Sequence, residues 1–137
     1  MSLGTWNPAD GTEQLNYQPD PRVITACASF AATDNWAASL VDWVNATLPS
    51  DANQMMKAGQ AAWQPCLTDM DRNSLLALVR FFTLVEQRLP QWHGGDTSPV
   101  IWITRHLRQR GEPLDRDTLL WIKANTDNRF LPNGPLL

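Results

Sequence analysis

Histidine and cysteine, the side chains that most often bind metals or act as nucleophiles, are rare in this sequence. The chain has two of each, and neither pair stands at a metal-ligand spacing such as C-x-x-C or H-x-x-x-H. The histidines, His93 and His106, are thirteen residues apart. The sequence therefore predicts no metal site and no bound cofactor. We interpret His106 as a helix residue that packs beside Trp102.

The segment around His93 is the place where catalysis is conceivable. Trp92, His93 and the Gly94-Gly95 pair precede a predicted helix whose N-terminus could hold an anion, and His93 could act as a general acid or base. Neither a G-x-S-x-G nucleophile motif nor a glycine-rich phosphate loop occurs in the chain. His93 is thus the candidate catalytic residue, but a plain flexible loop is the favoured interpretation.

Three arginines, Arg105, Arg108 and Arg110, fall within six residues and could bind phosphate groups. Two observations oppose nucleic-acid binding. The next predicted helix is apolar where a recognition helix needs polar side chains, and the sequence pI of about 5.2 is acidic, whereas nucleic-acid modules are usually basic. A solvated face is the favoured interpretation of this cluster, followed by a protein-binding face and then by nucleic acid.

The C-terminal part of the chain carries more large apolar side chains than one small helix needs. The run Leu119–Ile122 covers the whole circumference of a predicted helix and includes Trp121, and Phe130 and Leu131 follow in the tail. The tail could fold back and bury these residues. The alternative is an interface with another protein or with a second copy in a homodimer. We therefore take Trp121, Phe130 and Leu131 as binding candidates.

The two cysteines, Cys27 and Cys66, are expected to be reduced and buried thiols, with one disulfide as the alternative. The N-terminus has neither the basic start nor the apolar segment of a signal peptide. The longest apolar run, Leu75–Val85, is interrupted by Arg80 and is too short to span a bilayer. We expect a cytoplasmic protein without membrane association.

The elements that position these residues are predicted to be helices throughout. Apolar residues at helical spacing predict a central helix at about 69–89, with Thr68 and Asp71 as its capping box. Another helix is predicted at roughly 51–63 and is closed by Pro65. The other predicted helices begin at residues that favour N-caps, namely Asp20, Asp34 or Asn35, Ser98 and Asp115.

This pattern predicts an all-α fold, a compact bundle of five or six helices around the central helix. Residues 22–126 form the predicted helical domain, residues 1–21 an extended arm and residues 127–137 an irregular tail, both packed on its surface. The formal charge is −6 in residues 1–71 and +3 in residues 72–137. Such an asymmetry could hold the halves together or steer a charged partner.

No single motif assigns a function. The favoured expectation is a non-enzymatic protein-interaction or regulatory module, whose partner is another protein or a second copy of the chain. The first alternative is a nucleic-acid-binding protein that uses the Arg105, Arg108 and Arg110 cluster. The second is an enzyme or small-molecule binder that uses the His93 loop.

Overall fold

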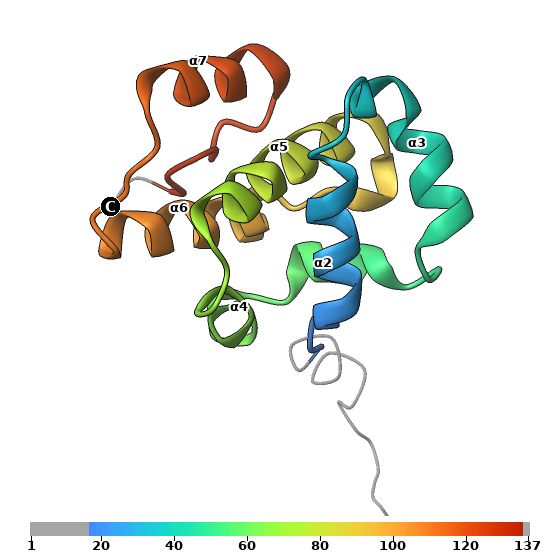
Figure 1. The fold of residues 1–137 in the computed structure, drawn as a ribbon, viewed down its shortest axis with the longest axis horizontal. Helices are drawn as coiled ribbons and strands as arrows, with labels where there is room; N and C mark the ends of the chain where they lie inside the picture. The colour runs from blue at the N-terminus through green and yellow to red at the C-terminus, as the bar shows by residue number, and fades with distance from the viewer. Residues whose placement is uncertain (1–16, 136–137) are drawn as a thin grey trace, which may run out of the picture.

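The computed structural model describes residues 17–135, and within them it contains helices and no strand. The all-α prediction is confirmed (Figure 1). Residues 17–135 form six α-helices and three short 3₁₀ turns. The α-helices are α2 (Pro21–Phe30), α3 (Trp36–Thr47), α4 (Gln60–Leu67), α5 (Arg72–Arg88), α6 (Pro99–Gln109) and α7 (Arg116–Asn125). The 3₁₀ turns are η1 (Ala52–Lys57), η2 (Pro90–Trp92) and η3 (Gly95–Thr97).

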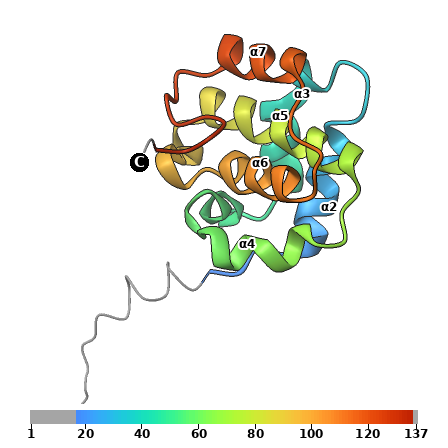
Figure 2. The ribbon, with the colours of Figure 1, turned by 90° about the vertical axis from the view of Figure 1, so that its left-hand side faces the viewer.

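Helix α5 is the centre of the fold, as its apolar pattern predicts. Helices α2, α3, α6 and α7 all pack against it, and α4 packs against α6 (Figures 1 and 2). Nine side chains of α5 are buried, so this helix is apolar on more than one side, as is typical of a central element. They are Leu75, Ala77, Leu78, Val79, Phe81, Phe82, Thr83, Leu84 and Val85.

The central helix begins later than predicted, at Arg72 instead of residue 69. Asp71 is its N-cap, and its carboxylate accepts the backbone N–H of Ser74 at 2.8 Å. Thr68 ends the preceding helix instead of starting this one, because its hydroxyl donates to the Gln64 carbonyl at 3.1 Å. A Thr side chain can satisfy a carbonyl one turn back as readily as it caps a new helix, so its type alone does not settle the boundary.

The predicted helix at 51–63 is wrong, because the chain forms η1 and α4 there. Gly59 separates the two with a φ of +89°, a conformation that glycine adopts without strain. Pro65 does not close α4 but lies inside it. Trp63 and Leu67 on either side of Pro65 are both fully buried, and their packing outweighs the helical hydrogen bond that a proline removes.

Aromatic rings fill the centre of the bundle. Trp63 and Phe82 meet edge to face at 5.5 Å, and Phe81 packs in the same way on Phe82 at 5.3 Å. The buried indole N–H of Trp63 donates to the Met55 carbonyl at 3.0 Å. This bond also fixes η1 against α4, so a single tryptophan joins the two elements that replace the predicted helix.

The tail returns across the bundle after α7. Leu131 and Pro132 are buried, and the Gly134 backbone N–H donates to the Phe130 carbonyl at 2.6 Å. Most of the predicted arm, residues 1–16, lies outside the described residues, as do Leu136 and Leu137. Tyr17, the first described residue, packs half-buried on the core.

Candidate functional site

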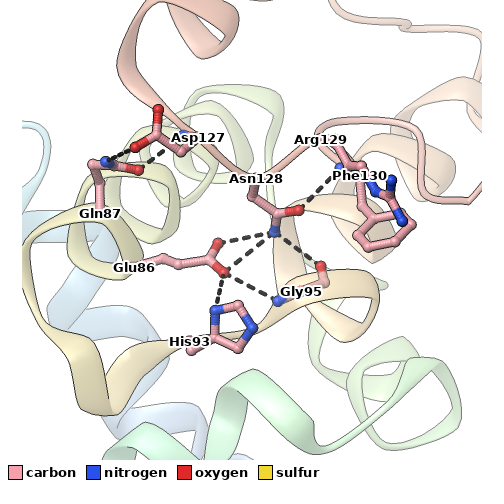
Figure 3. A pocket seen from close by; sticks show the side chains of 8 residues that line it. All are labelled: Glu86, Gln87, His93, Gly95, Asp127, Asn128, Arg129 and Phe130. Carbon is pink, nitrogen blue, oxygen red and sulfur yellow. Dashed lines mark hydrogen bonds and ion pairs between the residues drawn. The ribbon is translucent and has the colours of Figure 1, made fainter.

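Glu86, near the C-terminal end of α5, is the buried centre of a polar cluster (Figure 3). Its side chain is 5% exposed. One carboxylate oxygen, Oε2, accepts the backbone N–H groups of Gly94 at 2.8 Å and of Gly95 at 3.0 Å. The side-chain amide of Asn128 donates to both carboxylate oxygens at 3.2 Å. A buried carboxylate of this kind is tolerated because donors surround it.

Two segments distant in sequence meet at Glu86. The Asn128 amide also donates to the Gly95 carbonyl at 2.9 Å, and its oxygen accepts the Phe130 backbone N–H at 2.9 Å. Next to it, Gln87 and Asp127 bond twice: the Asp127 backbone N–H donates to Gln87 Oε1 at 2.9 Å, and Gln87 Nε2 donates to Asp127 Oδ2 at 2.8 Å. The end of α5 thereby holds the loop at 93–95 and the segment at 127–130 together.

Close packing explains why a glycine stands at position 94. A Cβ atom there would lie 2.9 Å from the Cα atom of Ser98, closer than real contacts allow. Ser98 is the buried N-cap of α6, and its hydroxyl accepts the Val100 N–H at 3.2 Å. The backbone at Gly94 can thus approach both Glu86 and the start of α6, which a larger residue would prevent.

A pocket of about 410 Å³ opens beside the cluster. Its lining combines groups that are already paired with groups that still have free hydrogen-bonding capacity. The lining residues are Glu86, Gln87, His93, Gly95, Asp127, Asn128, Arg129 and Phe130 (Figure 3).

His93, the candidate from sequence, lies at the edge of this pocket. Its side chain is 71% exposed, and its Nδ1 atom is 3.5 Å from Oε2 of Glu86. A carboxylate beside Nδ1 favours the tautomer that carries the proton there, which leaves Nε2 as an acceptor. The residue is therefore oriented by Glu86 and open to solvent at the same time.

The arginine cluster is used within the fold. The Arg105 guanidinium lies over the Trp102 ring at 5.3 Å and donates to Gln60 at 3.4 Å, and Arg108 donates to the Asn133 side chain at 2.6 Å. Arg108 therefore fastens the tail to α6 and is not a wholly free cation.

The last arginine of the cluster, Arg110, holds the connection between α4 and α5. It donates to the Met70 carbonyl at 2.8 Å and forms an ion pair with Glu112 at 2.7 Å. The three arginines do not line the Glu86 pocket.

The apolar candidates fall in different environments. Leu131 is 1% exposed, and Phe130 is half-buried with the Arg129 guanidinium 5.0 Å from its ring centre. Trp121 is half-buried and lines a shallow pocket with Arg80, away from Glu86. Leu120 is 55% exposed, but one exposed leucine is ordinary on the surface of a monomer.

Burial shifts the pKa values of the remaining titratable candidates in the direction that favours their neutral forms. Burial, and then the nearby Arg110, lower the pKa of His106, whose Nδ1 lies 3.3 Å from the Gln64 amide. Both cysteines are free thiols; burial raises the pKa of Cys27 to about 12 and also raises the pKa of Cys66. Cys66 is half-buried and not fully buried as expected; it packs against the core, and its thiol donates to the Pro19 carbonyl at 3.9 Å.

Sequence reasoning found His93 but not the residues that surround it. Glu86 was detectable as an acidic residue directly after five buried positions of α5, although such a position is more often a helix end that reaches solvent. Asn128 and Arg129 stand in the polar run Asn125–Arg129, which carries no recognisable chemistry until Glu86 is placed beside it.

Three comparisons with known proteins give no relative. No protein-family model, no curated protein and no solved structure matches this chain. Among residues 17–135, no helix combines the length and apolarity needed to cross a bilayer. In the same part of the chain, no group of three or more His, Cys, Asp or Glu side chains is placed to hold a metal ion.

Proposed function

We propose that this protein is a non-enzymatic binding module that recognises a protein partner at the Glu86 pocket. One observation carries the proposal: segments 93–95 and 127–130 meet on a buried carboxylate and leave a pocket whose outer side chains have free hydrogen-bonding groups. A buried charge lowers the stability of the folded protein unless hydrogen-bond donors surround it. A polar cluster that supplies these donors fixes one arrangement of the two segments, which apolar packing alone would not require.

The chemistry of the pocket favours binding over catalysis. Glu86 and Asn128 use their oxygen and nitrogen atoms to hold neighbouring backbone groups, so neither is free to accept a substrate proton. The eight lining residues include no Ser, Thr, Cys or Lys to serve as a nucleophile. His93 could still move a proton, but its side chain is 71% exposed, so the ring is open to solvent and not enclosed in a site that excludes water.

The same contacts weigh against the nucleic-acid alternative. Arg105, Arg108 and Arg110 each bond to groups of the chain itself, so phosphate binding would have to replace those contacts. The free thiols of Cys27 and Cys66 favour a reducing compartment, and on that basis we propose the cytoplasm.

Affinity purification from native cells tests this function. The wild-type chain is compared with Arg129→Glu, which reverses a charge in the pocket, and with Arg116→Glu, which makes the same change at an exposed position of α7. We expect a specific protein to be retained by the wild type and by Arg116→Glu and lost with Arg129→Glu. Equal retention by all three would overturn the proposal. A retained second copy of the chain, with a doubled mass in light scattering, would identify a homodimer.

A further inference from the structure

We infer that the Glu86 pocket recognises a free α-carboxylate together with the N–H group on the same α-carbon, as at the carboxyl terminus of a peptide chain. This inference rests on the proposed function and names its ligand chemistry. It follows from the one cation and the two acceptors that the lining residues leave unused.

The cation is Arg129. Its side chain lies on the exposed side of the pocket, 5.0 Å from the Phe130 ring, and within residues 17–135 it forms no ion pair with a carboxylate. This position over the Phe130 ring limits where the guanidinium can lie and leaves its N–H groups available. A planar guanidinium edge matches the two oxygens of a carboxylate, which it can bind through two parallel hydrogen bonds.

The acceptors are Asp127 and His93. Oδ2 of Asp127 receives the Gln87 amide, so its other oxygen, Oδ1, remains for a ligand. His93 directs Nδ1 toward Glu86, so Nε2 is left as an acceptor. Figure 3 shows Asp127 and Arg129 on different sides of the pocket, with His93 below them. A ligand that fits this set needs one anion and a nearby donor.

Charge favours an amino-acid carboxylate over a phosphate. Glu86 and Asp127 line the same pocket as Arg129, so the carboxylates outnumber the guanidinium. A doubly charged phosphate would be repelled by both carboxylates, whereas a singly charged carboxylate with an N–H donor beside it complements Arg129 and Asp127 together. The donor is a backbone N–H in a peptide and an ammonium group in a free amino acid.

Size indicates how much of a ligand enters. A volume of about 410 Å³ lies at the small end of ligand pockets, which span roughly 300–1,000 Å³. It can accept the last one or two residues of a chain but not a folded domain. The rest of a partner would remain on the surface next to His93 and Arg129, both of which are exposed.

The probe that tests this inference is N-acetyl-trialanine with a free carboxylate, titrated into ¹⁵N-labelled protein. We expect saturable shifts of the Gly94, Gly95 and Asn128 amide signals, because Gly95 and Asn128 line the pocket and the Gly94 N–H bonds to Glu86, which also lines it. The same peptide with a C-terminal amide should bind roughly tenfold more weakly or worse, since it lacks the charged acceptor. Free L-alanine distinguishes the sources: binding as tight as that of the peptide would identify an amino-acid site instead of a chain terminus.

Arg129→Gln should remove the binding of the free-acid peptide, while Arg116→Gln on α7 should keep it. Amide spectra of both variants confirm that they are folded. Equal shifts with the acid and the amide, or no shift with either at tens of millimolar, would overturn the inference. If the wild type still retains a protein in the affinity purification and Arg129→Glu does not, then only the inferred ligand, a free α-carboxylate, is wrong and the proposed function stands.

Discussion

Helices α2 and α7 pack on the same central helix but bury different numbers of side chains. Helix α2 buries Ile24, Cys27 and Ala28, whereas α7 buries Ile122 alone. In Figures 1 and 2, α5 lies between the two. The chain after α7 is held by polar bonds to Glu86 and Gln87 in addition to the buried side chain of Leu131.

This difference separates a stable core from an adjustable attachment. The stabilisation from apolar burial is proportional to the buried area and does not depend on the direction of any one contact. A buried hydrogen bond, in contrast, is lost when either of its partners is removed. The pocket lies at the polar attachment, and we expect the segments there to open more readily than the core.

Phe82→Ala should cause the largest loss of stability. Phe82 is fully buried between Trp63 and Phe81, and truncating such a ring costs about 3–5 kcal/mol. Urea unfolding followed by circular dichroism measures this loss. Phe130→Ala is the matched control in the tail, where the ring is half-buried and the expected loss is smaller. Equal losses would mean that the tail belongs to the same stability unit as the core.

Truncation after Asn128 should lower the melting temperature by several degrees. It removes Leu131, which is 1% exposed, and burying one leucine contributes about 1.5–3 kcal/mol. Thermal melting by circular dichroism gives the shift. A chain ending at Gly134 keeps Leu131 and should melt close to the wild type. An unchanged melt of the shorter chain would show that the tail adds no stability.

Glu86→Gln should loosen the polar attachment and leave α2 in place. Gly94 and Gly95 both donate to Oε2, so the Gln oxygen can take that place, and its amide nitrogen then stands where Oε1 accepted the Asn128 amide. The Asn128 amide thereby loses this acceptor and faces a second donor, at a cost of about 1–3 kcal/mol. Hydrogen exchange should speed up at Gly94, Gly95 and Asn128. Amides of α2 serve as the internal control, and faster exchange in both regions alike would contradict the separation of core and attachment.

The two helix caps give the smallest and most closely matched test. Asp71 caps α5 by accepting the Ser74 N–H, and Asp115 caps α7 by accepting the Thr118 N–H, both at 2.8 Å. Asp71→Ala should lower the global melting temperature slightly, because α5 is central. Asp115→Ala should instead speed hydrogen exchange within α7 alone. The opposite assignment would show that α7 unfolds together with the core.

Both caps also predict a dependence on pH. The backbone hydrogen bond from Ser74 lowers the pKa of Asp71, and the hydrogen bonds from Thr118 lower the pKa of Asp115. A pKa that is lower in the folded state contributes stability above the ordinary carboxyl pKa, and this contribution is lost as the pH falls through the folded value. The two variants should therefore differ from the wild type at neutral pH and approach it under strongly acidic conditions.

The helical fold was predictable because its signals are local. The caps at Asp20, Ser98 and Asp115 and the apolar pattern of the central helix are each set by a few neighbouring residues. The error at 51–63 arose where tertiary burial overrides a local signal, since fully buried neighbours carry α4 past Pro65.

The candidate site was not predictable in the same way. Glu86 and Asn128 are 42 residues apart in the chain, and no periodicity relates them. His93 could be proposed from its type and its glycine neighbours, but the carboxylate that orients it lies on another element. The arginine cluster was visible as a run of charge, whereas its partners, such as Asn133 and Met70, are set only by the folded chain.

The single carboxylate at Glu86 has a consequence for how this sequence can change over time. It binds backbone at Gly94 and Gly95 and a side chain at Asn128, so a change at one of these places alters what the others need. Gly94 has no room for a Cβ atom, so no other residue can replace this glycine, whichever residues stand at 86 and 128. A related chain that has diverged in sequence should therefore keep a glycine at 94 and change residues 86 and 128 only together. Leu120, which is exposed on α7, can be replaced without affecting the others.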